Sequence, residues 1–352
     1  MKRFLIIILI ILFLPVFVYA KETPKTHVDV AFTIDNNYPV FTMIFIDSIL
    51  ANSKADYTFW VVENNVTDKN KAKMKKYVEE DKHQKIEFIH TDTKVLDGGD
   101  NLFAFSNYIT SIGFARILLP ELLPKTVHKV LYLDSDMLAT GDISKLYNMP
   151  LGNKIAGMVP NFVDDNKALE LYQFKNGYYN SGMILMNLDM CRAENSSGQM
   201  VAFLKKNKDK FLFNEDSRET VKWIYPDQDV INIVWDGKIK QIPEIWNNQS
   251  IRNQSMEDVF YPGIIHYIGP SKPWDFEGTL SYSYIKLYFE HWKNSPFSKY
   301  RYYYFAQKYI KDYKKLIMKK IRRYKLFFER VKNKSRIDSI IYLFYTPEKM
   351  KR

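Results

Sequence analysis

The sequence is poor in the residues that mark several common kinds of site. It holds one cysteine, Cys191, in 352 residues, which excludes an internal disulfide and a zinc site built from cysteines. It has only 13 glycines, and no Gly-x-Gly-x-x-Gly follows the first predicted strand, so the fingerprint of a dinucleotide-binding domain is absent. The adjacent pair Gly98 and Gly99 falls in a polar stretch that predicts a loop.

The apolar run at the start of the chain, residues 4–18, is short. Its 15 residues fall below the roughly 20 that a membrane-spanning helix needs, and Pro15 interrupts them. Two cations precede the run, and Ala20 closes it. This arrangement predicts a signal peptide over residues 1–20, with an uncleaved signal anchor as the alternative. In either case the segment is not part of the fold.

Positive charge is concentrated at the other end of the chain. Residues 298–352 hold 18 Lys and Arg against 4 Asp and Glu, a surplus of +14, while the rest of the chain carries −3. A nearly neutral body argues against nucleic acid as a partner. Apolar residues of this tail share one helical stripe: Ile310, Tyr313, Ile317, Ile321, Tyr324 and Phe328. We predict a basic amphipathic tail that contacts an anionic membrane surface; the alternative is a helix docked on the body.

Strand-like and helix-like segments alternate through the first part of the chain. Strands are predicted at residues 28–34, 57–63 and 85–90, and helices at residues 39–50 and 69–80. This alternation predicts an α/β fold with a doubly wound, mainly parallel sheet and flanking helices. We assign it to a single domain over residues 26–297, followed by the basic helical tail.

A continuous apolar run, Val130 to Leu133, leads directly into two carboxylates. Such a run predicts a strand that is buried on both faces of the sheet. Asp134 and Asp136 follow two positions apart, so both can reach one cation at the carboxyl end of the strand, where open α/β sheets bind ligands. Carboxylates suit Mg²⁺ or Mn²⁺ held together with substrate phosphates. A solvated Asp-Ser-Asp turn is the alternative.

Two further polar features stand beside apolar segments. Arg116 lies in an apolar helix predicted over residues 108–124, where it can meet a phosphate or a carboxylate instead of solvent. The run Asn180 to Gly182 precedes an apolar strand. It is either a plain turn or a place where the backbone can approach a sugar closely.

The later part of the chain adds two more candidates. Asp227 opens a helix-like run, where an Asp is often only a cap. His266 ends a short apolar segment, and Lys272 follows in a turn rich in Gly and Pro. The imidazole can be a third metal ligand and the ammonium a phosphate contact, or both can be structural.

Taken together, these segments resemble family 8 of the retaining glycosyltransferases, which includes bacterial lipopolysaccharide galactosyl- and glucosyltransferases and glycogenin. The resemblance covers residues 28–275. Its most specific part is the acidic pair after a buried strand combined with His-x-x-Gly-x-x-Lys-Pro-Trp. The matching segments, in the family's order, are Ala31 to Tyr38, Phe114 to Pro120, Tyr132 to Asp136, Tyr179 to Gly182, Asp227 to Asp229 and His266 to Trp274.

The resemblance implies a GT-A-like fold, a UDP-sugar donor, and Asp134, Asp136 and His266 as ligands of Mn²⁺ or Mg²⁺. Asp227 and Gln228 would lie near the anomeric carbon as the catalytic residues. The implied donor contacts are Asp35 and Tyr38 at the nucleotide, Arg116 at the sugar or its phosphate, Asn180 and Ser181 along the sugar, Gly269 and Lys272 at the diphosphate, and Ala31, Thr33, Asp134 and Ser135 elsewhere on the donor.

The expected activity is transfer of glucose or galactose from a UDP-sugar to a glycan or glycolipid acceptor such as lipopolysaccharide, with retention. Front-face attack is favoured over a covalent intermediate because Gln228 would be a weak nucleophile. Family members often carry an acidic residue where this chain has Pro160 and Asn161, so the sugar stays open. The alternatives are a haloacid-dehalogenase-type phosphohydrolase, whose D-x-D also follows a strand, and a non-catalytic sugar-nucleotide- or glycan-binding relic.

The sequence features that bear on cellular location point in different directions. The signal-like start favours a secretory-pathway lumen or the periplasm, and several Asn-x-Ser/Thr sequences suit the lumen. The basic tail favours an anionic cytoplasmic leaflet instead. We therefore expect a membrane-associated protein and leave the side of the membrane open.

Overall fold

The computed structural model describes residues 26–91, 111–161, 174, 177–207, 226–249, 262–269, 272–274, 282–302, 306, 310, 314 and 317–325. The predicted signal peptide, the Gly98–Gly99 loop and two members of the tail stripe, Tyr313 and Phe328, lie outside these residues. The acidic pair, Arg116 and His266 lie within them, whereas residues 270 and 271 of the matched segment His266 to Trp274 do not.

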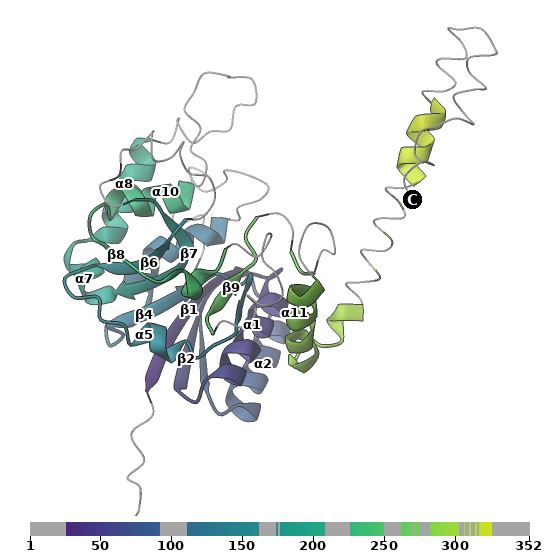
Figure 1. Cartoon of the computed structure of the whole chain (residues 1–352), viewed down its shortest axis with the longest axis horizontal. Coiled ribbons are helices and arrows are strands. Elements are labelled where there is room, and N and C mark those ends of the chain that lie inside the picture. The colour runs from purple at the N-terminus through teal and green to yellow at the C-terminus, as the bar shows by residue number, and fades with distance from the viewer. Residues whose placement is uncertain are drawn as a thin grey trace, which may run out of the picture.

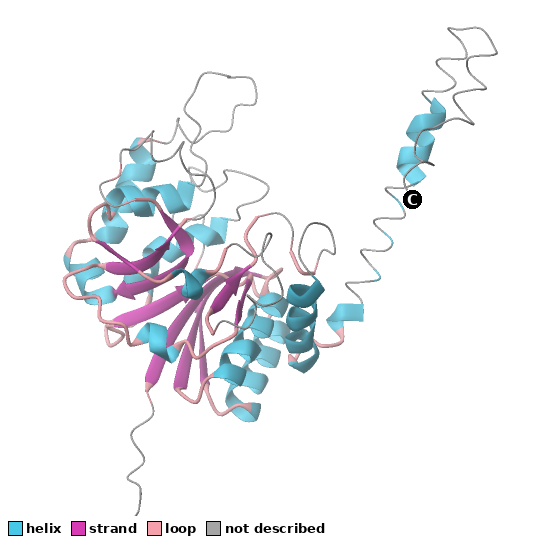
Figure 2. Cartoon of the chain, viewed as in Figure 1, coloured by secondary structure: helices cyan, strands magenta, loops and turns pink. Residues whose placement is uncertain are grey.

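A seven-stranded sheet forms the centre of the body, in the order β3-β2-β1-β4-β7-β6-β8 (Figures 1 and 2). Within this sheet β7 runs antiparallel to its neighbours, whereas the other strands share one direction. The prediction of a mainly parallel sheet is therefore confirmed. The bounds are His27–Asp35 (β1), Asp56–Asn64 (β2), Lys85–His90 (β3), Lys129–Leu133 (β4), Ala156–Pro160 (β6), Tyr179–Asn187 (β7) and Ile239–Gln241 (β8).

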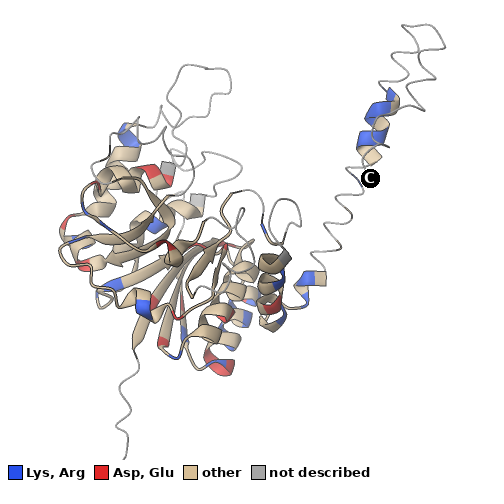
Figure 3. Ribbon diagram, viewed as in Figure 1, with Lys and Arg blue, Asp and Glu red and all other residues tan. Residues whose placement is uncertain are grey.

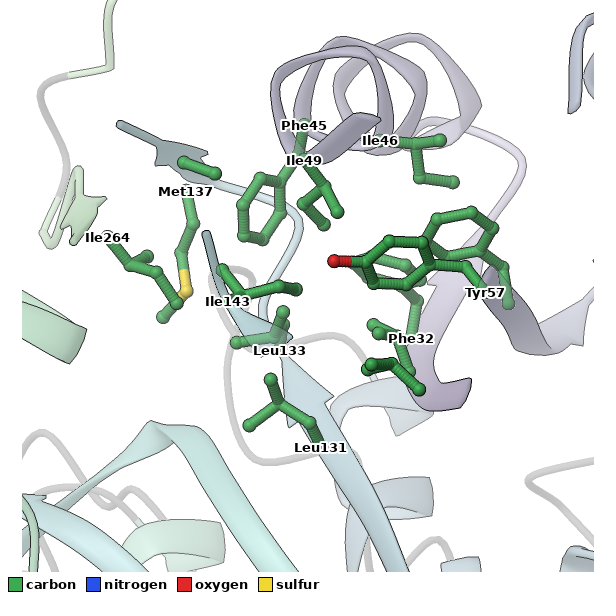
Figure 4. Packing of buried hydrophobic residues seen from close by; sticks show 14 of the residues in the cluster. Phe32, Phe45, Ile46, Ile49, Tyr57, Leu131, Leu133, Met137, Ile143 and Ile264 are labelled. Carbon is green, nitrogen blue, oxygen red and sulfur yellow. The ribbon is translucent and has the colours of Figure 1, made fainter. Parts of the chain in front are cut away.

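One face of the sheet is covered by α1 (Pro39–Asn52), α2 (Asp68–Lys75) and the π-helical turn η1 (Lys76–Asp81) that continues α2. Every second residue of β1 and β4 points toward these helices, as the two-residue period of a strand requires. Figure 4 shows Phe45 and Ile49 of α1 against Phe32 and Leu133 of the sheet. This first core holds α1 in a fixed position beside the end of β4.

The opposite face is covered by η2 (Ser111–Leu118), α4 (Leu119–Leu122), α7 (Leu188–Ala193), α8 (Ser196–Lys206) and α10 (Pro226–Val234). The intervening residues of the strands, among them Ala31 and Tyr132, enter this second core. Within the described residues the single helix predicted over 108–124 is wrong: a 3₁₀ helix precedes one α-helical turn. Pro120 falls in the first turn of α4, where proline favours the start of a new helix.

A second, two-stranded antiparallel sheet joins β5 (Met137–Ala139) to β9 (Ile264–His266). Strand β5 directly follows β4 along the chain and precedes the short helix α5 (Ser144–Tyr147), and η3 (Glu244–Asn247) lies next to β9. Helix α11 (Tyr282–Asn294) packs on α1 through an aromatic cluster that includes Phe41, Trp274, Tyr288 and Trp292. These later elements bring residues from the end of the domain to the edge of the main sheet.

Residues 317–325 form a helix with exposed side chains. Ile317, Met318, Ile321 and Tyr324 are 39% to 56% exposed. Figure 3 shows Lys and Arg residues along the same segment. Across the described parts of the chain, no helix combines the length and the apolar character that crossing a membrane requires.

Candidate active site

Asp134 and Asp136 lie at the carboxyl end of the central strand β4. The backbone N–H of Asp134 donates to the carbonyl of Gly182 in β7 at 2.8 Å. Because β7 is reversed, its first residues reach the same edge of the sheet as the last residues of β4. The side chains of Asp134 and Asp136 are 23% and 17% exposed. The predicted acidic pair thus stands where α/β sheets bind ligands.

His266 reaches the acidic pair through the sheet of β5 and β9. It pairs with Met137, and the N–H of Tyr267 donates to the carbonyl of Asp136 at 3.0 Å. The Nε2 atom of His266 lies 3.3 Å from Oδ1 of Asp136 and 4.0 Å from Oδ2 of Asp134. Ligand atoms of the three residues all lie within 4.8 Å of one another. The three residues predicted as metal ligands therefore converge.

The donor set and the space around it fit a hard divalent cation. Two carboxylates and an imidazole nitrogen suit Mn²⁺, and the carboxylates suit Mg²⁺. Gly182 faces the ligands: a Cβ atom there would lie 2.4 Å from Cε1 of His266 and 2.9 Å from Oδ2 of Asp134. Any side chain at position 182 would have to displace a ligand.

Arg116 and Tyr132 contact the other oxygen of Asp134, Oδ1. The Nη2 atom of Arg116 lies 3.2 Å from it, and the hydroxyl of Tyr132 donates to it at 2.5 Å. Burial raises the pKa of Tyr132, so its hydroxyl stays a donor. Arg116 also lies 3.5 Å from Asp227 and donates to the carbonyl of Ser181 at 3.0 Å. Arg116 therefore points into the site, where its positive charge compensates the negative charges of two carboxylates.

Burial and neighbouring charges give the two carboxyl groups different pKa values. Burial alone would raise the pKa of Asp136, but the ammonium of Lys272 and the imidazole of His266 hold it well below the usual range. Burial raises the pKa of Asp134; Arg116 opposes this rise and Asp136 adds to it. The two carboxyls therefore titrate as a pair, in which Asp136 is the more acidic member.

Lys272 brings a positive charge to the same place. Its Nζ lies 2.5 Å from Oδ2 of Asp136 and donates to the carbonyl of Tyr267 at 2.6 Å. Gly269, in the preceding turn, has φ +76°, a backbone conformation that favours glycine. The structure thus places the predicted phosphate contact beside a predicted metal ligand, with a carboxylate as its present partner.

Asn180 and Ser181 belong to β7, so the prediction that they precede the strand is wrong. Backbone pairing needs only N–H and C=O groups, so on the β4 side it reaches Gly182; on the β6 side the register shifts between Met158 and Pro160, and pairing resumes at Tyr179. Gln228 of α10 reaches them: its Oε1 accepts from the N–H of Ser181 at 3.0 Å and from Nδ2 of Asn180 at 3.2 Å. Oδ1 of Asn161 accepts from the same Nδ2 at 3.1 Å.

The remaining predicted donor residues lie near β1 and α1. Asp35 ends β1, and Tyr38 precedes α1. The hydroxyls of Thr33 and Ser135 are each hydrogen-bonded to another hydroxyl of the protein. Ala31 is completely buried in the second core. Contacts between these five residues and a sugar nucleotide remain predictions.

Two residues of the site, Tyr132 and Asn247, were not among the predicted site residues. Tyr132 stands two positions before Asp134 at the end of a strand, so the two-residue period could have placed both side chains on one side. Oδ1 of Asn247 accepts a hydrogen bond from Nδ1 of His266 at 2.8 Å. Nothing in the local sequence around Asn247 indicates this contact, because it depends on how η3 and β9 pack.

Comparison with known proteins places the chain among glycosyltransferases. It is 25% identical over 293 residues to the lipopolysaccharide 1,3-galactosyltransferase of Salmonella typhimurium, covering 80% of this chain and 82% of that protein. It is 29% identical over 271 residues to the lipopolysaccharide glucosyltransferase WaaO of Escherichia coli, covering 72% and 74%. The similarity therefore runs through most of each protein.

The solved structure of the galactosyltransferase LgtC, in complex with donor and acceptor sugar analogues, is similar with a TM-score of 0.62. The likeness covers 76% of this chain and 96% of that one, at 21% identity, and shows a shared GT-A fold. The model of the family described as "Glycosyl transferase family 8" matches residues 29–278, which include every predicted ligand of the metal. The chain is accordingly a hexosyltransferase and belongs to glycosyl transferase family 8.

Proposed function

We propose that this hexosyltransferase is metal-dependent and retaining, and moves glucose or galactose from a UDP-sugar to a glycan or glycolipid acceptor such as lipopolysaccharide. The observation that carries the proposal is the convergence of Asp134, Asp136 and His266 beside Lys272. Similarity to transferases named for galactose, glucose and lipopolysaccharide supports the sugar and acceptor classes. Membership of an enzyme family removes the phosphohydrolase and the non-catalytic relic as alternatives.

The charges of the site suit departure of a nucleoside diphosphate. A divalent cation held by the two carboxylates and the imidazole would act as a Lewis acid on the leaving diphosphate. Lys272 would add a second positive charge at the same place, where the diphosphate would compete with Asp136 for its ammonium. Arg116, which contacts Oδ1 of Asp134, would keep that carboxylate turned toward the cation.

The surroundings of Gln228 favour front-face attack. Its Oε1 already accepts two hydrogen bonds, from the N–H of Ser181 and from Nδ2 of Asn180, and an amide oxygen engaged twice is a poor nucleophile. The nearby carboxylate of Asp227 is 8% exposed and lies 3.5 Å from Arg116. We therefore assign Gln228 to stabilising the oxocarbenium-like centre, with the acceptor attacking the face from which the diphosphate leaves.

Membrane association is a further part of the proposal. The helix at residues 317–325 exposes apolar residues together with Lys319, Lys320, Arg322 and Arg323. Such a helix binds an anionic lipid surface by burying its apolar side chains while its cations pair with headgroups. A glycolipid acceptor would then lie in the same surface as the enzyme.

The test is a calorimetric titration of UDP with and without Mn²⁺, followed by Mn²⁺-dependent hydrolysis of UDP-glucose and UDP-galactose. We expect UDP and Mn²⁺ to bind in a coupled manner, and one of the two sugars to be hydrolysed faster. Asp136→Asn should remove the coupling, because it replaces a metal ligand. Asp189→Asn is the matched control, since Asp189 also pairs with a histidine, His128, but is 58% exposed and away from the site.

Two results would contradict the proposal. One is UDP binding of equal strength with and without Mn²⁺ in the unmodified protein. The other is loss of the coupling in both variants, which would trace it to general instability instead of the metal ligands. The anomeric configuration of the product, read by NMR, tests retention separately.

A further inference from the structure

A row of buried amide side chains connects the predicted metal ligand to the predicted catalytic residue. Its members come from three separate elements, β7, η3 and α10. Each is almost inaccessible to solvent, with between 1% and 9% of its surface exposed. Buried amides need partners for both their oxygen and their NH₂ group, so the orientation of one dictates that of the next. From the metal ligand His266 in β9, the amides follow in the order Asn247, Asn180 and Gln228.

Two backbone N–H groups determine the orientation at the Gln228 end. The N–H of Gly182 faces Oδ1 of Asn180 at 3.0 Å, and the N–H of Ser181 faces Oε1 of Gln228 at 3.0 Å. A backbone N–H can only donate, so the atoms that it meets are oxygens. The NH₂ group of Asn180 is then the group that lies 3.2 Å from Oε1 of Gln228.

The same logic passes along the row to His266. The amide of Asn247 meets Oδ1 of Asn180 at 2.9 Å, and this contact requires the NH₂ group of Asn247. Its remaining atom, Oδ1, therefore faces Nδ1 of His266 at 2.8 Å. Because that oxygen can only accept, Nδ1 must carry the proton. In the neutral imidazole the lone pair of Nε2 then faces Asp136 and Asp134, on the side where a cation bound by the three residues would lie.

We infer that Asn247 is a positioning residue with two tasks: it holds His266 in the metal-binding tautomer, and through Asn180 it keeps the oxygen of Gln228 turned toward the backbone of β7. The inference rests on the proposed metal dependence. Partners that orient a ligating histidine in this way contribute about 10- to 100-fold to metal affinity or activity. The backbone supports the contact, because the N–H of Asn248 donates to Ile264 and the N–H of His266 donates to Asn248.

Two substitutions separate the tasks. Asn247→Asp keeps an oxygen for Nδ1–H of His266 but sets a second oxygen against Oδ1 of Asn180. We expect Mn²⁺ affinity within about threefold of the unmodified protein and a fall in kcat of about tenfold or more. Asn247→Leu removes both contacts, so Mn²⁺ affinity should fall about 10-fold or more as well. Calorimetry without donor measures affinity, and ¹⁵N NMR of the imidazole reports which nitrogen carries the proton.

Asn187→Ala is the control for loss of stability, because Asn187 caps α7 at the opposite end of β7. It should lower stability without changing Mn²⁺ affinity. The inference is overturned if Asn247→Leu binds Mn²⁺ as the unmodified protein does with the same imidazole spectrum, or if Asn247→Asp loses affinity as strongly as Asn247→Leu. If the unmodified protein fails to bind Mn²⁺ at all, the proposed function fails instead, and the imidazole spectrum alone then tests the tautomer.

Discussion

Gly182 illustrates how one residue controls the site by having no side chain. In Gly182→Ala the new Cβ would meet His266 and Asp134 at distances that atoms do not adopt, so one of these ligands must move. We expect Mn²⁺ affinity to fall about tenfold or more, which corresponds to at least about 1.4 kcal/mol of binding free energy. Calorimetry on the folded variant measures the change.

A control at the other end of the molecule separates this effect from instability. Gly152 has φ +63° and no atom within 4 Å of a built Cβ, so Gly152→Ala introduces backbone strain without a collision. It should lower the free energy of unfolding and leave Mn²⁺ affinity unchanged. Equal affinity in Gly182→Ala and the unmodified protein would show that the ligands do not occupy the observed positions when the metal binds.

Arg116 is the residue whose removal should cost most stability. Its guanidinium is 9% exposed and lies between Asp134 and Asp227, so Arg116→Met leaves two carboxylates without a counter-charge. Breaking a buried ion pair on one side destabilises by about 3–5 kcal/mol, and we expect a loss of that order in urea unfolding. Arg192→Met should lose less, because Arg192 donates mainly to backbone carbonyls. Similar losses in the two variants would rule out a special electrostatic role.

At the scale of elements, Glu63 fastens the end of β2 to the start of α2. It accepts hydrogen bonds from the N–H of Val66 at 2.8 Å and from Lys71 at 2.7 Å. Burial by itself would raise the pKa of Glu63, but these donors and His90 lower it overall. A carboxyl with a lowered pKa in the folded state stabilises the protein above its unfolded pKa, and this contribution disappears as pH falls through the folded pKa.

We therefore predict a loss of stability at low pH in the unmodified protein that Glu63→Gln should not show. Below pH 4.5, the ordinary pKa of a glutamate, the free energy of unfolding should fall more steeply with pH in the unmodified protein than in Glu63→Gln. Urea unfolding at a series of pH values measures both slopes. Glu87→Gln, at an exposed position of β3, should behave as the unmodified protein does. Identical slopes in all three proteins would refute the argument.

At the scale of the whole molecule, we propose different tasks for the body and the tail. Phe297 is 1% exposed, and Lys73 lies 5.2 Å from its ring and 5.0 Å from that of Tyr300, so the body includes the turn after α11. Of the residues that the structure describes, a deletion that starts after Tyr302 removes only exposed ones. It should abolish binding to vesicles that contain phosphatidylglycerol and leave Mn²⁺-dependent UDP-sugar hydrolysis unchanged.

A charge variant tests the same point without shortening the chain. Replacing Lys319, Lys320, Arg322 and Arg323 by Gln should weaken vesicle binding by about a thousandfold, since each cation near an anionic surface contributes about 1 kcal/mol. Co-sedimentation with the vesicles measures the binding, and vesicles of phosphatidylcholine alone are the control. Binding that persists in the variant, or that is equal on neutral vesicles, would contradict an electrostatic membrane contact.

Much of the fold is readable from local pattern. Alternation of strands and helices predicted the parallel units of β1 to β4, and the apolar run before Asp134 predicted a strand buried on both faces, as β4 is. The spacing of apolar residues, every two positions in a strand and every 3.6 in a helix, is a local property, so it can be recognised in a single sequence. The acidic pair was also found locally, because its two members are two positions apart at the end of one strand.

Tertiary structure alone decided which distant residues complete the site. Lys272 lies 136 positions from Asp136, and His266 reaches the pair only because β5 and β9 form their own small sheet. The reversed direction of β7 brings Asn180 to Gly182 to the same edge, and the packing of η3 brings Asn247 to His266. Such contacts depend on chain direction and on packing between elements, which no local period encodes, so local pattern indicated these residues only singly and the family resemblance alone grouped the metal ligands.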